Sequence, residues 1–300
     1  MDNNEFTVRF WGVRGSYPVP GPFTLFFGGN TACVEVRVGG HLIILDAGTG
    51  IIGLGRKLAK QGEPVVATLL FSHTHHDHLQ GFPFFEPANR DSTVLYMFGP
   101  RDFGQSIEES LARAMLAPTF PVALSDLRSL RLIGNFVDES QILILDKKHE
   151  ARLENVHLGL QNISPQAVQI HMLRNYAHPN GVNVYRISWQ GKTLVYATDT
   201  ESYVGGDTRL IAFSRDADLL IHDAQYSDDE YVAAIGSKQG WGHSTHSMAL
   251  SACKQAGVKM LAFFHHDPLH SDEQILKIEQ ACQREFPHSF MAREGLTVSL

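Results

Sequence analysis

Cysteine is scarce in this sequence: only Cys33, Cys253 and Cys282 occur among 300 residues, none of them in C-x-x-C spacing. So few cysteines exclude a disulfide framework, and their spacing excludes a cysteine-ligated structural zinc site. Their apolar or helical surroundings favour reduced, buried thiols in a cytoplasmic protein.

Long apolar runs are missing as well. No run is long enough to span a bilayer, which predicts that the protein does not enter a membrane. Residues 1–5 are polar and acidic, where a secretory signal peptide would be basic and then apolar. Both absences predict a cytoplasmic location.

Positive charge is not in excess, since the formal net charge is -7. This charge disfavours polyanions in general, and nucleic-acid binding would need a local basic patch that the sequence does not display. The length of 300 residues is sufficient for a sizeable core in one large domain or two small ones.

A histidine cluster directly follows an apolar segment. Val65–Phe71 is short and apolar, which indicates a buried strand, and it leads into His73, His75, Asp77 and His78. In such a loop the first two histidines can point the same way while the other two residues turn back to face them. Imidazole and carboxylate without cysteine suit zinc, manganese or iron. The alternative is a polar surface loop that is merely rich in histidine.

Further polar residues follow predicted strands in the second half. His178 lies in a proline-fixed turn after one strand, and Asp199 leaves a buried strand. His265 and His266 follow another apolar strand. A carboxylate at such a place is costly unless it is paired or bound to a metal. Taken alone, His178 would more often be an ordinary turn residue than a ligand.

The pattern His-x-His-x-Asp-His at residues 73–78 resembles the signature of the metallo-β-lactamase superfamily of di-metal hydrolases. The resemblance implies one metal on His73, His75 and His178, a second on Asp77, His78 and His265, and Asp199 between both. His265 is preferred because it stands three residues before Pro268, the His-x-x-Pro spacing of the related ribonuclease family. His266 is the alternative, and His76 is expected at the surface or behind the ligands.

The implied fold is one αββα sandwich, in which two mixed sheets pack face to face with helices outside and the metals lie at one edge. We expect a single domain over residues 1–300, with two similar halves at about 1–150 and 151–300. Residues 118–154 contain no motif tied to chemistry and are a candidate for substrate-facing loops.

Local signals mark further features. Gly39-Gly40 between two apolar runs predicts a β-hairpin, and Ser271 with Gln274 predicts a capping box at the start of the last helix. Asp46 has two interpretations. The resemblance implies a supporting residue near the metals, whereas a cap for the helix that starts near Ile51 is at least as plausible.

Gly242-His243-Ser244-Thr245 resembles the His-Ser-Thr element of ribonuclease Z and related phosphodiesterases, whose histidine contacts the scissile phosphate and assists the leaving oxygen. Its acidic partner there is a glutamate, whereas this chain has the shorter Asp223. An acidic partner would raise the imidazole pKa and favour proton donation. The predicted catalytic residues are therefore Asp77, His243 and Asp223. The candidate substrate contacts are Arg14, in a glycine-rich loop expected at the border of the site, Asn30 and Ser244.

The resemblance implies two divalent metal ions, Zn²⁺ or Mn²⁺ with iron also suited, which lower the pKa of the attacking water so that it loses a proton near neutral pH. We predict hydrolysis of a small phosphodiester, such as a 2′,3′- or 3′,5′-cyclic nucleotide, because the chain is acidic and has no evident basic arm for tRNA. Superfamily relatives are often homodimers, which implies a homodimer here.

Three alternatives remain open. The first is a tRNA 3′-processing endoribonuclease of the ribonuclease Z kind, the only reading in which RNA is a partner. The second is a hydrolase of a lactone, thioester or β-lactam with the same fold. The third is a di-iron redox module, which is disfavoured because such modules normally have an acidic residue at the position of His75.

Overall fold

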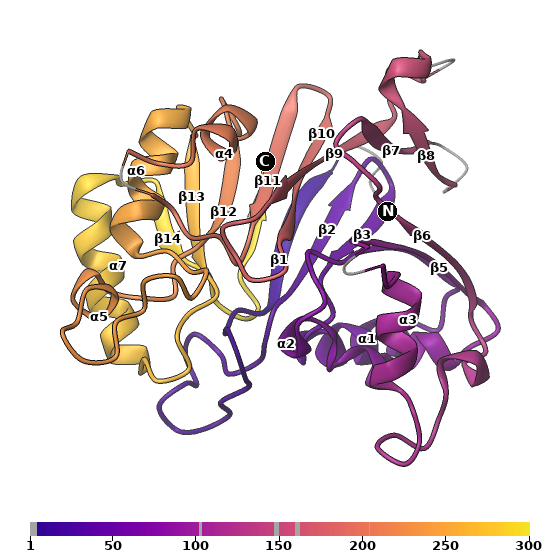
Figure 1. Cartoon of the computed structure of the whole chain (residues 1–300). Helices are drawn as coiled ribbons and strands as arrows, with labels where there is room; N and C mark the ends of the chain where they lie inside the picture. Colours follow the sequence, from indigo (N-terminus) through magenta and orange to yellow (C-terminus); the bar gives the residue numbers. More distant parts are fainter. Residues whose placement is uncertain (1–4, 102–103, 147–149, 160–162, 204) are drawn as a thin grey trace.

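The computed structural model describes residues 5–101, 104–146, 150–159, 163–203 and 205–300. Over these residues the chain forms two β-sheets that face each other, with helices on their outer sides (Figure 1). Both sheets contain parallel and antiparallel neighbours. The predicted αββα sandwich of two mixed sheets is therefore confirmed.

The first sheet comes from the first half of the chain, apart from its edge strand β15. Among the described residues its order is β15-β1-β2-β3-β4-β5-β6. Strands β15 to β3 pair antiparallel, whereas β3 to β6 run parallel. The strands are β1 (Phe6–Gly12), β2 (Cys33–Val38), β3 (His41–Leu45), β4 (Val65–Leu70), β5 (Thr93–Gly99), β6 (Leu130–Asn135) and β15 (Thr297–Ser299).

The second sheet has the order β14-β13-β12-β11-β10-β9-β7-β8 within the described part of the chain. Strands β11 to β14 are parallel, and the other neighbours are antiparallel. The strands are β7 (Gln141–Leu145), β8 (Ala151–Asn155), β9 (Val168–Asn175), β10 (Val182–Trp189), β11 (Lys192–Ala197), β12 (Leu219–Asp223), β13 (Met260–Phe264) and β14 (Ser289–Met291).

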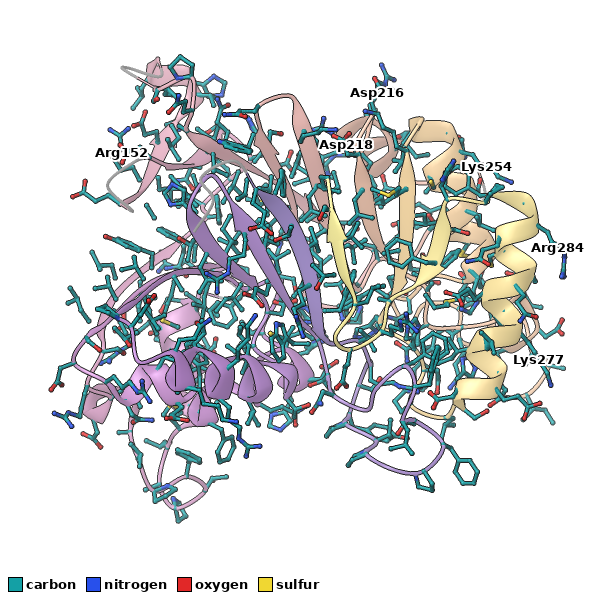
Figure 2. The ribbon with its side chains drawn as sticks, turned by 180° about the vertical axis from the view of Figure 1, so that it is seen from behind. Arg152, Asp216, Asp218, Lys254, Lys277 and Arg284 are labelled. Atoms are coloured by element: carbon teal, nitrogen blue, oxygen red, sulfur yellow. The ribbon has the colours of Figure 1, made fainter. Side chains whose placement is uncertain are left out.

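Amphipathic helices cover both outer faces. Ile51, Leu54 and Leu58 lie three and four residues apart and bury one stripe of α1. On the solvent-facing side of other helices the side chains are charged: Figure 2 shows Lys254 of α6 and Lys277 of α7 pointing outward. None of the helices in the described ranges combines the length and apolarity needed to cross a membrane. The helices are α1 (Gly50–Gln61), α2 (His76–Leu79), α3 (Ile107–Ala114), α4 (Thr208–Phe213), α5 (Asp228–Tyr231), α6 (His246–Ala256) and α7 (Asp272–Glu285).

Apolar side chains from both sheets fill the space between them. Phe10 on β1 lies against Phe264 on β13, with 6.1 Å between ring centroids. Tyr185 and Tyr196 are fully buried in the same core, and Tyr196 donates a 2.8 Å hydrogen bond to Asp46, which directly follows β3 of the first sheet. Each large apolar side chain stabilises such a core by about 1.5–3 kcal/mol. The two sheets are thus fixed relative to each other, and so are the loops at their edges.

Parallel strands bring their carboxyl ends to one edge of the sandwich. Strands β3 and β4 are parallel in the first sheet, as are β11, β12 and β13 in the second. Residues that end or follow parallel strands lie at the same sheet edge. At this edge lie Asp46, His73, Asp199, Asp223 and His265.

Candidate metal centre

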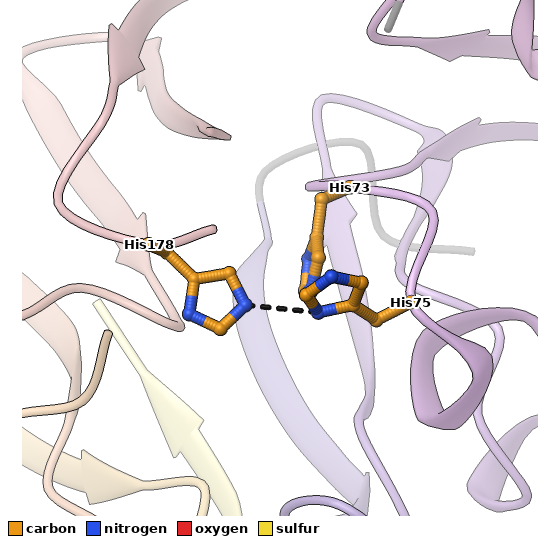
Figure 3. Close-up of side chains that lie close together, drawn as sticks. All are labelled: His73, His75 and His178. Carbon is orange, nitrogen blue, oxygen red and sulfur yellow. Dashed lines mark hydrogen bonds between the residues drawn. The ribbon is translucent and has the colours of Figure 1, made fainter. Parts of the chain in front are cut away.

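Side chains from both sheets converge at this edge. His73 and His75 follow β4, whereas His178 follows β9 of the other sheet, and the three point toward one another (Figure 3). Their potential ligand atoms lie within 4.8 Å of one another. The same is true of the second predicted set, Asp77, His78 and His265. The structure therefore brings together both ligand sets that the sequence predicted.

The orientation of several imidazoles is fixed by acceptors on nitrogen Nδ1. Three rings hold Nδ1 within 3.0 Å of an acceptor: Asp46 Oδ2 for His78, the Gly242 carbonyl for His178 and Gln225 Oε1 for His265. Because each acceptor takes the Nδ1 proton, the lone pair on Nε2 is the one that faces the cluster. Neutral imidazole in this tautomer is the form that binds a metal.

His73 contributes a buried nitrogen that has no hydrogen-bond partner in the protein. His73 Nε2 is hidden from solvent, makes no hydrogen bond and lies 3.7 Å from Asp199 Oδ2. In addition, His178 Nε2 and His75 Nδ1 face each other at 2.9 Å. At least one of these two nitrogens therefore presents a lone pair toward the cluster. Buried polar atoms are rarely left unsatisfied, and a divalent cation would satisfy both features. The residues present fit divalent metal ions.

Asp199 lies between the two ligand sets. Its Oδ2 is 3.3 Å from His265 Nε2 and 3.7 Å from His73 Nε2, so one carboxylate borders both. Burial raises the pKa of Asp199, but His265, His78 and His73 outweigh burial and hold that pKa well below its ordinary value. Burial lowers the pKa of His178 to about 4. Ionised carboxylate and neutral imidazole are the states that metal binding requires.

The backbone is strained where three of these side chains leave their strands. The φ angle is 59° at Asp46, 52° at Asp199 and 63° at His265, all in the left-handed region. A non-glycine residue there costs of order 1–3 kcal/mol, and such residues cluster at functional sites. The strain coincides with the sharp turn that directs each side chain into the shared edge.

Two glycines let neighbouring backbone approach the imidazoles. A Cβ at Gly15 would lie 2.4 Å from Cε1 of His265, and one at Gly242 would lie 2.3 Å from Nδ1 of His178. Either contact would displace the ring. The glycine-rich loop at residues 12–16 therefore borders the site.

Asp46 supports His78 and does not cap a helix. Its carboxylate accepts from the backbone N–H and the hydroxyl of Ser72, both at 2.7 Å, and from Tyr196. Helix α1 has Thr49 as its N-cap residue. Of the two interpretations of Asp46, the geometry favours the supporting one.

Asp46→Asn should weaken zinc binding about 10- to 100-fold, because the carboxylate holds the ring of His78 and polarises it. Titration against a chromophoric chelator measures this affinity. Glu35→Gln is the matched control, since Glu35 is 2% exposed and accepts a 2.8 Å hydrogen bond from Trp11, outside the cluster. Equal zinc affinity in the Asp46 and Glu35 variants would contradict the supporting role.

His243 lies beside the cluster and pairs with Asp223. Its Nδ1 is 2.6 Å from Asp223 Oδ2, and its ring stacks on His265 with 5.0 Å between centroids. The other oxygen of Asp223 accepts from the Ser244 backbone N–H at 2.9 Å. Burial lowers the pKa of His243. The charge of Asp223 and its hydrogen bond with the imidazole of His243 outweigh burial and raise the pKa to about 9. The shorter aspartate therefore reaches the imidazole and favours its cationic form.

The candidate substrate contacts Arg14, Asn30 and Ser244 make hydrogen bonds within the protein. The guanidinium of Arg14 is fully buried and donates to three carbonyls, those of Gly28, Asp267 and His270. Asn30 donates to Glu294 at 3.0 Å. Ser244 is fully buried, and its hydroxyl donates to the carbonyl of Thr200 at 2.6 Å. Arg14 and Ser244 are buried, whereas Asn30 is half-buried. Contact of these three side chains with a substrate stays a prediction.

Two histidines next to the ligands lie outside the cluster. His266 Nε2 donates to the carbonyl of Ala292 at 2.8 Å, so His265 is the one that faces the cluster. His76 is exposed at the start of α2, as expected.

Three residues that position the site were not predicted. Each makes a hydrogen bond at the site. The Ser16 N–H donates to Asp77 Oδ2 at 2.8 Å, Gln225 Oε1 accepts from His265 Nδ1, and the Glu201 carboxylate accepts from the Gly242 N–H at 2.7 Å. Glu201 and Gln225 each stand two residues after a predicted aspartate. This short distance in sequence from a candidate site residue was the signal that could have identified Glu201 and Gln225.

Comparisons with known proteins agree with this geometry. A family profile described as "Beta-lactamase superfamily domain" matches residues 41–266, more than half of the chain. Ribonuclease Z from Thermococcus sibiricus is 26% identical over 285 residues, which cover 86% of this chain and 87% of that protein. The metallo-beta-lactamase fold protein YhfI from Bacillus subtilis shares the fold, with a TM-score of 0.67 and 18% identity. The similarity covers 99% of this chain and 100% of that chain. Human tRNase Z, short form, does so with a TM-score of 0.63, 20% identity and 98% coverage of each chain.

Proposed function

The chain belongs to the beta-lactamase superfamily of metal-dependent hydrolases, and from that premise we propose that it hydrolyses phosphodiesters, with RNA as the substrate class. The pair of His243 and Asp223 beside the metal ligands carries this proposal. Phosphodiester hydrolysis expels an oxygen that needs a proton, and a cationic imidazole at this place can supply it.

The side chains divide into binding and proton-transfer roles. Histidines and carboxylates would hold two cations, one on His73, His75 and His178 and one on Asp77, His78 and His265, with Asp199 shared. When bound, Zn²⁺ or Mn²⁺ would supply Lewis acidity and a reactive water. Asp77, whose carboxylate accepts a hydrogen bond from the Ser16 N–H, would orient that water. Asp223 keeps His243 protonated, and His243 donates to the leaving oxygen.

The names of the relatives support RNA. Ribonuclease Z and tRNase Z are similar to this chain over most of its length. A small cyclic nucleotide is the second candidate, because a net charge of -7 disfavours a large polyanion.

A substrate panel tests the proposal. The purified protein, loaded with Zn²⁺ or Mn²⁺, is assayed on bis-p-nitrophenyl phosphate, 2′,3′- and 3′,5′-cyclic nucleotides, precursor tRNA and a β-lactam. We expect the protein to hydrolyse phosphodiesters and a chelator to abolish this activity. RNA should be cleaved faster than cyclic nucleotides. The reverse order would select the second candidate, and hydrolysis of the β-lactam alone would contradict the proposal.

A further inference from the structure

We infer that a groove beside the metal centre binds the bases of a single-stranded nucleic acid flanking the scissile phosphate, with Tyr176 as the stacking surface. The inference rests on the proposed function and specifies its substrate. The groove has a volume of about 1110 Å³. Its lining includes His178, a predicted metal ligand, and Glu201, which holds the backbone before His243. It therefore adjoins the centre.

The groove is larger than one nucleotide requires. Pockets for drug-sized ligands have volumes of about 300–1,000 Å³, and a cyclic nucleotide is a ligand of that size. This groove exceeds the upper end of that range. Several linked nucleotides fit its dimensions better than one.

Tyr176 presents an exposed ring to this groove. Its relative exposure is 75%, although it stands only two residues before the buried His178. The guanidinium carbon of Arg174 lies over the ring, 5.6 Å from its centroid. The cation covers one face of the ring, and a base can stack on the other. Stacking of this kind tolerates any base.

The turn that carries Tyr176 is held rigidly. Arg174 Nη1 donates to Asn183 Oδ1 at 3.0 Å, and Nη2 donates to the Asn180 carbonyl at 2.6 Å. These bonds join the two sides of the turn, so the backbone that carries Tyr176 loses little conformational freedom when a base binds. The same turn carries His178, and both residues line the groove. A base stacked on Tyr176 would therefore lie beside the candidate metal centre.

Charges in the groove favour contacts with bases over contacts with phosphates. Its described lining residues include three arginines and three acids, namely Arg101, Arg174, Arg209, Asp138, Glu139 and Glu201. Glu139 pairs with Arg209. Without net positive charge the groove cannot grip many phosphates, so binding should depend only weakly on salt.

Competition against bis-p-nitrophenyl phosphate tests the groove, because any oligonucleotide that enters it competes whether or not it is cut. We expect the inhibition constant to fall from one to two to four nucleotides of single-stranded RNA, with a shallow salt dependence. Tyr176→Ala should raise the constant for the tetranucleotide about fivefold or more, with kcat and KM for the small diester unchanged. Tyr176→Phe should retain the wild-type value.

Phe23→Ala is the matched control, since Phe23 is 73% exposed and does not line the groove. Inhibition that is independent of length, or equal in the wild type and Tyr176→Ala, would overturn the inference and leave the phosphodiesterase proposal standing. A steep salt dependence would assign the groove to phosphates and overturn the stacking role. If the small diester is not cleaved, the proposed function fails, and anisotropy of a labelled tetranucleotide with both proteins still decides the groove.

Discussion

Asp199→Ala should lower kcat for bis-p-nitrophenyl phosphate about a thousandfold. Its carboxylate borders both ligand sets, at 3.3 Å from His265 and 3.7 Å from His73, so its removal weakens both cation sites together. Metal ions contribute several kcal/mol to transition-state stabilisation, and each 1.36 kcal/mol is about tenfold in rate. Steady-state kinetics and metal analysis by mass spectrometry measure the two losses.

Thermal unfolding separates loss of metal from loss of fold. Metal ions that bind only the folded state stabilise it. A chelator should therefore lower the thermal unfolding midpoint of the wild type and leave the midpoint of Asp199→Ala nearly unchanged. Asp229→Ala, which removes an exposed carboxylate, should behave as the wild type does. An Asp199→Ala protein that retains two metal ions and the wild-type kcat would contradict the shared position of Asp199.

Features that depend on neighbours in sequence were predictable. The hairpin across Gly39-Gly40 joins β2 and β3, and Ser271 forms a capping box with Gln274 at the start of α7. The resemblance of residues 73–78 to a known ligand pattern located the first candidate ligands, which the fold brings together with His178 and His265. These cases share one physical basis, because turns, caps and closely spaced ligands are set by local backbone geometry.

Features that depend on contacts across the fold were not predictable. Arg14 stands in a glycine-rich loop, and no local signal shows that its guanidinium is buried against carbonyls about 250 residues later. The groove is lined by residues from separate parts of the chain, among them residues 100–101, 136–139, 176–181, 201, 203, 209 and 240. Residues 136–139 belong to the segment without motifs. Its place at the groove follows from the packing of β6 and β7 into different sheets.

His243→Ala should lower kcat about 10²- to 10⁴-fold on an RNA dinucleotide, but only a few-fold on bis-p-nitrophenyl phosphate. A ribose oxygen is a strongly basic leaving group that needs a proton, and general acids contribute rate enhancements of that size. p-Nitrophenolate leaves without one. The ratio of the two kcat values, with both substrates at saturation, therefore isolates proton donation from metal binding.

The pH dependence adds a second readout for the same pair. Because His243 must be protonated to donate and its pKa is raised to about 9, kcat on the dinucleotide should fall as the pH rises through that value. Asp223→Asn removes the charge that raises this pKa, so the fall should begin at lower pH. His76→Ala, the loss of an exposed histidine next to the ligands, should leave both the ratio and the pH profile unchanged. If His243→Ala slows both substrates equally, His243 acts through the metal site or the fold, and the leaving oxygen takes its proton from another group.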